Sequence, residues 1–105
     1  RIAHLYEPNH PAIIRTIRSV IQAGHQKGLT VSICGEMAGD PLFVPLLFGL
    51  GADDLSVTPG SVPETKFQIR KMQFSSAAEL AEEILELSDP REVYDRLSVF
   101  YRELN

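Results

Sequence analysis

The fold of this chain is decided by the stretch Thr30-Val-Ser-Ile-Cys-Gly-Glu-Met-Ala-Gly-Asp-Pro41. Its β-branched residues run up to Cys34, and Gly35 follows at once, which indicates a short strand that ends at the thiol. Asp40-Pro41 then opens a helix, because Asp caps helices well and Pro suits the first helical position. The single cysteine of the chain therefore lies at the carboxyl end of a strand, where α/β proteins keep their functional residues.

Helical and extended segments alternate around this stretch. The first half of the chain is expected to form a helix from Pro11 that is capped by Asn9 or His10 and stopped by Gly28, a strand Leu29–Cys34, and a helix 41–49. The true start of this second helix lies nearer Val44, because Pro45 costs it a hydrogen bond. The second half is expected to form a strand Asp54–Thr58 and the helices 61–72, 76–87 and 90–104, which are opened by the capping residues Ser61, Ser76 and Asp89. Apolar stripes are expected at Ile13, Ile14, Ile17, Val20 and Ile21 in the first helix and at Val93, Leu97, Phe100, Tyr101 and Leu104 in the last.

Two strands joined by a helical connection pair in parallel when they share a sheet. Parallel sheets usually contain more strands and are covered on both faces. We therefore predict an α/β fold in which residues 1–105 form the C-terminal portion, about strands 7 and 8 with their helices, of a truncated (β/α)8 TIM barrel. In such a barrel Thr30, Ser32 and Cys34 face the interior, and Val31 and Ile33 face the surrounding helices.

Composition narrows the class of protein. The net charge is −4, and the ten Lys and Arg residues are scattered, which argues against nucleic acid or an anionic membrane as the partner. No apolar run approaches the ~20 residues of a membrane helix. A lone cysteine forms no internal disulfide, so a reducing, cytoplasmic setting is expected. The sequence begins at Arg1, and we interpret it as a piece of a longer protein.

Cys34 has two interpretations. Free cysteine is often a small, buried core residue. The alternative is a functional thiol, because the small residues Gly35, Ala38 and Gly39 allow a ligand to approach the backbone. Glu36 lies two positions beyond the thiol and is a candidate supporting residue. The sequence alone leaves both interpretations open.

No second catalytic group stands out beside Cys34. His4, His10 and His25 lie in other segments, and surface or capping roles are expected for all three. No spacing matches a zinc site or a phosphate-binding loop of the P-loop type. Asp53-Asp54 is interpreted as a solvated turn before a strand. The acidic residues Glu82, Glu83 and Glu86 are expected on the wet face of their helix.

The run Cys34-Gly-Glu-Met-Ala-Gly-Asp40 resembles the active-site cysteine motif of enzyme I of the phosphotransferase system, the phosphoenolpyruvate–protein phosphotransferase family. Three more regions resemble the same family: His4–Pro8 the segment after barrel strand six, Pro45–Gly51 the helix after strand seven, and Asp54–Val57 with Ser61–Pro63 strand eight and the start of its helix. Pyruvate phosphate dikinases and phosphoenolpyruvate synthases share the Cys-Gly-Glu beginning, whereas the Met-Ala-Gly-Asp continuation is more similar to enzyme I.

This resemblance implies a cytoplasmic, dimeric phosphotransferase with a TIM barrel that acts in sugar transport. Such an enzyme moves a phosphoryl group from phosphoenolpyruvate to a histidine and on to the carrier HPr, and releases pyruvate. In this family a cysteine protonates the enolate, and the matching residue here is Cys34, with Glu36 in a supporting role. Aqueous thiols are mostly protonated at neutral pH, and burial in the barrel would keep this one so.

The remaining parts implied by the resemblance fall outside this sequence. The Mg²⁺ carboxylates and the phosphoenolpyruvate-binding residues precede Arg1, so no cofactor or metal ligand is expected in this fragment. None of the three histidines matches the phosphoacceptor. We therefore expect the isolated fragment to be inactive.

Three alternatives stay open at this point. The fragment is either part of a catalytic enzyme or a non-catalytic module that serves dimerisation, since open sheet edges favour association. Within the family, the nitrogen-regulatory paralogue and the pyruvate phosphate dikinase or phosphoenolpyruvate synthase branch are the other assignments.

Overall fold

A computed structural model describes residues 8–34, 36–56 and 59–104, without the side chains of Glu36 and Ser61. The segment His4–Tyr6 and the predicted strand end at Thr58 lie outside the described residues. The elements in chain order are α1 (Pro11–Gln26), β1 (Ser32–Cys34), α2 (Glu36–Gly39), α3 (Val44–Gly49), β2 (Asp54–Ser56), a 3-10 turn (Pro59–Ser61), α4 (Val62–Lys71), α5 (Phe74–Leu85) and α6 (Pro90–Leu104). Helices dominate, and none that is described is long and apolar enough to cross a bilayer.

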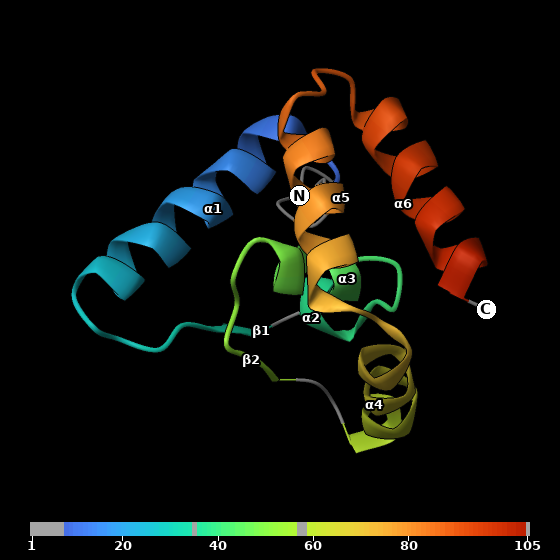
Figure 1. Cartoon of the computed structure of the whole chain (residues 1–105), viewed down its shortest axis with the longest axis horizontal. Helices are drawn as coiled ribbons and strands as arrows, with labels where there is room; N and C mark the ends of the chain where they lie inside the picture. Colours follow the sequence, from blue (N-terminus) through green and yellow to red (C-terminus); the bar gives the residue numbers. More distant parts are fainter. Residues whose placement is uncertain (1–7, 35, 57–58, 105) are drawn as a thin grey trace, which may run out of the picture.

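The core lies where α3 is covered by α5, with α1 and α6 on either side of α5 (Figure 1). Buried side chains from all these helices form one cluster, which includes Ile14, Ile21, Leu46, Leu47, Leu80, Ile84, Val93 and Leu97. The backbones of α3 and α5 approach so closely that a Cβ at Gly49 would collide with the carbonyl of Ala77. Glycine at position 49 is therefore a requirement of this packing.

The apolar stripe predicted for α1 is too wide. Ile14 and Ile21 are buried and Ile17 is partly buried, but 37% of Ile13 and 56% of Val20 remain exposed. Only the side of α1 that faces the core is covered. In α6 the predicted stripe is confirmed, because Val93, Leu97 and Phe100 are buried, with Leu104 packed at the edge.

Several predicted helix ends are confirmed by their hydrogen bonds. The Nδ1 of His10 accepts from the backbone N–H of Ala12 at 3.1 Å, which makes His10 the cap of α1. Gly28 follows this helix with φ of 75°, the left-handed conformation of a helix stop. At the start of α6, Asp89 Oδ1 accepts from the N–H of Arg91 at 2.9 Å.

Other boundaries differ from the prediction. The short helix α2 was not predicted, and α3 begins at Val44, as expected from Pro45, rather than at Pro41. Asp40 instead closes a turn, because its Oδ1 accepts from the N–H of Leu42 at 3.0 Å. The prediction that Ser76 caps α5 is wrong: this helix begins at Phe74, and its capping position makes no side-chain hydrogen bond.

The strands β1 and β2 pair in parallel, as predicted, with Ser32 opposite Asp54 and Cys34 opposite Ser56. The strand β1 is shorter than predicted, since it begins at Ser32 rather than at Leu29. Their residues alternate between the two faces: Ile33 pairs with Leu55 and both pack on the core, as does Val31. The predicted division of faces in β1 is therefore confirmed, with Ser32 and Cys34 exposed.

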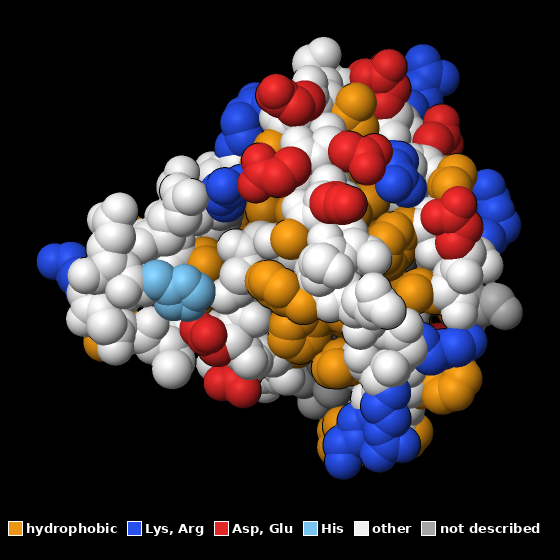
Figure 2. Space-filling model, viewed as in Figure 1, with side chains coloured by type: hydrophobic (Ala, Val, Ile, Leu, Met, Phe, Trp, Pro, Cys, Tyr) orange, Lys and Arg blue, Asp and Glu red, His pale blue; other side chains and the backbone are white. Residues whose placement is uncertain are grey.

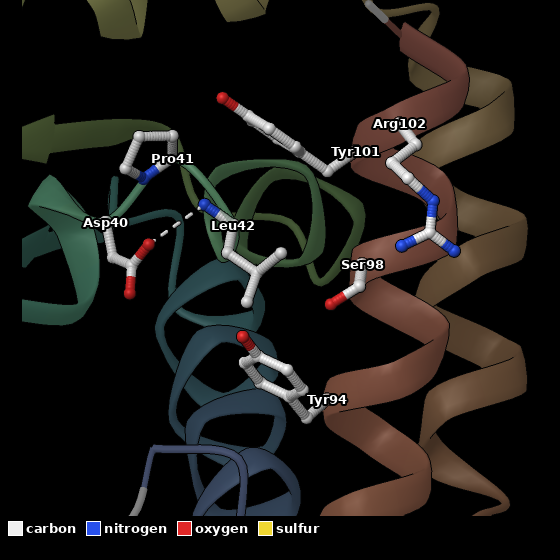
Figure 3. A pocket seen from close by; sticks show the side chains of 7 residues that line it. All are labelled: Asp40, Pro41, Leu42, Tyr94, Ser98, Tyr101 and Arg102. Atoms are coloured by element: carbon white, nitrogen blue, oxygen red, sulfur yellow. Dashed lines mark hydrogen bonds between the residues drawn. The ribbon is translucent and has the colours of Figure 1, made fainter.

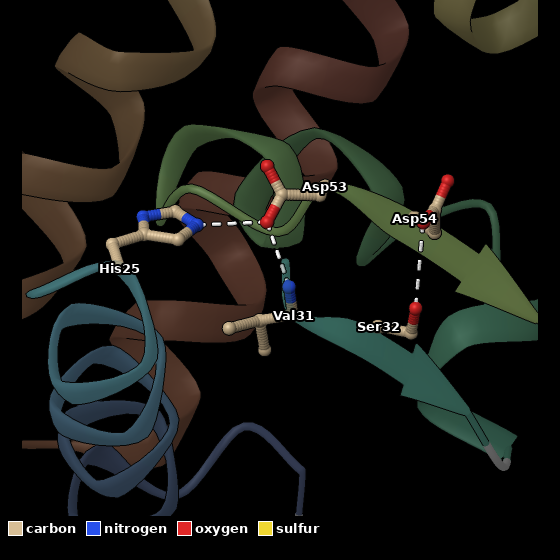
Figure 4. A network of polar contacts seen from close by, with 5 residues as sticks. All are labelled: His25, Val31, Ser32, Asp53 and Asp54. Carbon is tan, nitrogen blue, oxygen red and sulfur yellow. Dashed lines mark hydrogen bonds and ion pairs between the residues drawn. The ribbon is translucent and has the colours of Figure 1, made fainter. Parts of the chain in front are cut away.

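A single carboxylate joins α1, β1 and β2 (Figure 4). The Oδ2 of Asp53 accepts from the backbone N–H of Val31 at 2.7 Å and contacts Nε2 of His25 at 2.8 Å. The N–H of Asp53 in turn donates to the carbonyl of Val31 at 2.9 Å. The prediction that Asp53 is a solvated residue at a strand entry is confirmed, since it is exposed and directly precedes β2. Its side chain has a further role that was not predicted, because it aligns the two strands.

We predict a pH-dependent effect of Asp53→Asn. The hydrogen bond from Val31, and then His25, hold the pKa of Asp53 below its ordinary value. The folded pKa is thus lower than the unfolded one, so the carboxylate stabilises the fold above the unfolded pKa and stops doing so as pH falls through the folded pKa. Urea unfolding should show a lower free energy of unfolding for Asp53→Asn at neutral pH and a shrinking difference below about pH 4.

The neighbouring Asp54→Asn variant is the matched control. It removes the same charge, but among the described residues the hydrogen-bond partner of the Asp54 carboxylate is the Ser32 hydroxyl, at a long 3.5 Å, so its effect at neutral pH should be smaller. A difference for Asp53→Asn that stays constant from neutral to acidic pH would contradict the assigned role.

We also predict that Gly49→Ala destabilises the fold by about 1–3 kcal/mol, the usual cost of an overpacked contact. The added methyl group meets the backbone of Ala77, which has no side-chain freedom with which to relax. Gly60→Ala is the control, because a Cβ there has no atom within 4 Å, and its effect should stay within about 0.5 kcal/mol. Equal midpoints of urea unfolding for the two variants would disprove the close approach of α3 and α5.

Candidate functional site

Cys34 is the last residue of β1 and its thiol is exposed. The predicted position at a strand's carboxyl end is confirmed. The interpretation of Cys34 as a small core residue is wrong, and the expected burial of the thiol is not found in this chain. An exposed thiol on a rigid strand can meet a ligand, which a core cysteine cannot.

The thiol shares its face of the sheet with other small polar side chains. Parallel pairing puts Cys34 opposite Ser56 and Ser32 opposite Asp54, and all four are exposed. The hydroxyl of Ser32 lies 3.5 Å from Oδ2 of Asp54. The opposite face carries apolar side chains toward the helices. The sheet therefore presents a polar, hydrogen-bonding surface with the thiol at its carboxyl edge.

The segment after the thiol is anchored to the core. In α2, Met37 and Ala38 are 4% and 0% exposed, and Asp40 then donates its N–H to the carbonyl of Met37 at 3.3 Å. Glu36 is the first residue of α2, but its side chain is outside the described part, and its role stays a prediction. The anchored segment limits how far the backbone beyond Cys34 can shift.

Each described histidine has its own structural partner. His10 caps α1, and His25 contacts Asp53 at the other end of that helix, which agrees with the roles predicted for them. His4 lies outside the described residues. Within the described ranges, no three His, Cys, Asp or Glu side chains come together as a metal site would require. The described residues therefore offer no clustered ligand set of their own for a metal ion.

Two ion pairs connect the acidic face of α5 to its neighbouring helices. Glu82 contacts Arg18 of α1 at 3.1 Å, and Glu83 contacts Nε of Arg96 of α6 at 2.8 Å. A second bond from Arg96, at 3.2 Å, makes the latter pair bidentate, and this arginine lowers the pKa of Glu83. The glutamates predicted to face water on this helix are exposed, and acidic side chains gather over α5 in Figure 2. Two of the three, Glu82 and Glu83, also form ion pairs with arginines.

Two hollows in the described surface were not predicted. One, of about 310 Å³, lies between β2 and α4 and is lined by residues that include Phe48, Asp54, Leu55 and Lys66. The other, of about 430 Å³, lies between the turn 40–42 and α6. Both are formed by residues far apart in the sequence, so no local pattern could have revealed them.

Known proteins resemble this chain closely in sequence. Residues 1–74 match the family described as PEP-utilising enzyme, PEP-binding domain. Proteins named phosphoenolpyruvate-protein phosphotransferase are 43% identical over 93 residues in Geobacillus stearothermophilus, 39% over 103 residues in Listeria monocytogenes and 40% over 99 residues in Buchnera aphidicola. These matches cover 89%, 98% and 94% of this chain but only 16%, 18% and 17% of the relatives.

The predicted resemblance is thus confirmed at the level of the family. The matched residues include the whole of β1, α2, α3 and β2, and so contain both strands and the thiol. The chain belongs to the family of PEP-utilising enzymes, in which it matches the PEP-binding domain.

Proposed function

We propose that this chain is the C-terminal end of the PEP-binding domain of an enzyme I-type phosphotransferase. The proposal is supported by the family match and by relatives that are named phosphoenolpyruvate-protein phosphotransferase and are aligned over most of this chain. That enzyme would transfer a phosphoryl group from phosphoenolpyruvate to a histidine and on to an HPr-type carrier, with release of pyruvate.

In this proposal β1 and β2 are strands seven and eight of a (β/α)8 barrel, and residues 1–105 form one fragment of that domain. The parallel register supports it, because it requires the crossover connection that barrels use. The division of the sheet supports it further. Ile33 and Leu55 pack toward the helices, as on the outside of a barrel, while the exposed polar residues Ser32, Asp54 and Ser56 would face the interior.

The role proposed for Cys34 is proton donation to the carbon of pyruvate enolate. The Sγ–H bond breaks as a C–H bond forms at the enolate carbon, the enolate electron pair collapses into the ketone, and a thiolate remains. The observation that carries this role is the exposed thiol at the carboxyl end of β1. A general acid must be rigidly held and within reach of the carbon. Glu36, next to this thiol, is proposed to support the loop.

Other parts of the reaction belong to residues outside this chain. The phosphoacceptor histidine and the residues that bind phosphoenolpyruvate and Mg²⁺ are proposed to lie in the rest of a cytoplasmic, homodimeric protein. Alone, the chain is expected to be inactive.

We predict that Cys34→Ala and Cys34→Ser in a full-length phosphotransferase containing this sequence slow pyruvate formation about a hundredfold or more, the usual share of a general acid. The specific readout is exchange of the methyl hydrogens of pyruvate with deuterated water, because this exchange requires the proton donor itself. Both variants should lose it.

The control for that experiment is Ser32→Ala, which changes the same face of β1 without removing the thiol. It should keep exchange close to that of the unmodified enzyme. Near-normal exchange in the Cys34 variants would rule out the proton-donor role. Turnover of phosphoenolpyruvate by the 105-residue chain alone would show that the missing residues are not needed.

A second candidate function is assembly into a dimer, and exposed apolar side chains favour it. On α4 and at the start of α5, 54% of Phe67, 39% of Ile69 and 66% of Phe74 are exposed. In Figure 2 the lower end of the surface shows apolar side chains around a group of basic ones. Large exposed aromatic side chains of this kind mark association surfaces.

We therefore predict that the chain self-associates and that Phe67→Ser with Phe74→Ser weakens this association. Sedimentation velocity over about a hundredfold range of concentration should show a rising sedimentation coefficient for the unmodified chain and a smaller rise for the double variant. Val20→Ser, at an exposed apolar position of α1, should behave like the unmodified chain. A monodisperse monomer at every concentration would disprove this second function.

The branch of the family also remains a proposal. The phosphotransferase named in the relatives supports the enzyme I assignment over the dikinase or synthase branch. The nitrogen-regulatory paralogue has the same chemistry at Cys34, so the experiment on the thiol applies to it equally.

A further inference from the structure

A pocket of about 430 Å³ separates the turn after α2 from helix α6. One wall is the turn Asp40, Pro41 and Leu42, and the other is formed by Tyr94, Ser98, Tyr101 and Arg102 (Figure 3). The four α6 residues follow one another at helical spacing on a single face. The volume lies within the range of small-molecule sites.

The turn that forms one wall is held from two sides. Asp40 Oδ1 accepts from the N–H of Leu42 at 3.0 Å, and the amide of Gln68, which is 3% exposed, donates to the carbonyl of Pro41 at 3.1 Å. The pocket is therefore largely formed before any ligand arrives. A preformed site loses less entropy on binding.

Arg102 provides the charge that a ligand would meet. The other arginines that face neighbouring helices are paired, Arg18 with Glu82 and Arg96 with Glu83. Within the described residues no ion pair of Arg102 is found, and its guanidinium lies beside Ser98 at the rim of the pocket. A guanidinium and a hydroxyl four residues apart on one helix suit a carboxylate or a phosphate group.

The other residues that line the pocket determine which apolar group fits beside the anion and how the ligand is oriented. The ring of Tyr94 extends from α6 toward Leu42, with Pro41 on the same wall (Figure 3). These surfaces suit an aromatic or other flat apolar group. Asp40 stands on the wall opposite Arg102, and its negative charge disfavours the anionic end of a ligand there. The anion is thereby directed to Arg102.

We propose that this pocket binds a small organic acid, with its carboxylate or phosphate group on Arg102 and Ser98 and a flat apolar body between Tyr94 and the turn 41–42. The site is distinct from the proposed chemistry at Cys34, and it does not require that chemistry.

The test is a titration of the isotope-labelled chain followed by amide nuclear magnetic resonance. The probes are phenylacetate, phenyl phosphate and the neutral phenylacetamide. One or both acids should shift the amide signals of Leu42, Ser98 and Arg102 to saturation, with a dissociation constant below about 1 mM. The acid that binds more tightly shows whether the pocket prefers a carboxylate or a phosphate group. The neutral amide should bind at least about tenfold more weakly, because it lacks the charge-assisted bond to the guanidinium.

Arg102→Gln should weaken binding of the acids about tenfold or more, whereas Arg91→Gln should not. Arg91 lies exposed on the same helix and away from the pocket, so it controls for the change in net charge. Cys34→Ala should bind the acids unchanged, which keeps this result independent of the proposed enzyme function. Binding without saturation, equal binding of the neutral amide, or equal effects of the two arginine variants would overturn the proposal.

Discussion

The alignment of β1 with β2 is the constraint on which the rest of the structure depends. Asp53 accepts the N–H of Val31 with its carboxylate and donates its own N–H to the carbonyl of the same residue. This reciprocal pair holds the two strands just before the paired segment, and His25 joins the end of α1 to the same oxygen. A slip of one residue would turn every side chain of a strand to the opposite face. Cys34 faces outward because this register is held.

Much of the fold could be predicted because its signals are local. His10 before Pro11, Gly28 after α1 and Asp89 before α6 act within one turn of the chain, and their hydrogen bonds are those expected. The start of α5 could not be predicted in the same way. Phe74 begins this helix without a side-chain cap, because packing of the following turns against α3 outweighs the preference of Ser76 for a capping position.

The position of the candidate site along the chain could be predicted, but the residues that surround it in space could not. A strand that ends at Cys34 follows from residue types, whereas the exposure of the thiol depends on which residues cover the sheet. The five-residue stripe of α1 was overestimated for the same reason. Periodicity identifies an apolar face, but only tertiary packing decides that Ile14 and Ile21 are covered and Val20 is not. Arg102 carries no local signal, because its pocket is formed with a turn distant in sequence.

The two faces of the small sheet differ in what covers them. Parallel sheets are normally covered on both sides, yet among the residues that the structure describes, the face of Ile33 and Leu55 packs on the helical core and the side chains of the other face are exposed. Ser32, Asp54 and Ser56 can stay hydrated on the other face, because their polar groups lose nothing by contact with water. The same polarity would suit a water-containing, ligand-binding interior. Cys34 thus occupies the carboxyl edge of this polar face, where its thiol is accessible from outside the chain.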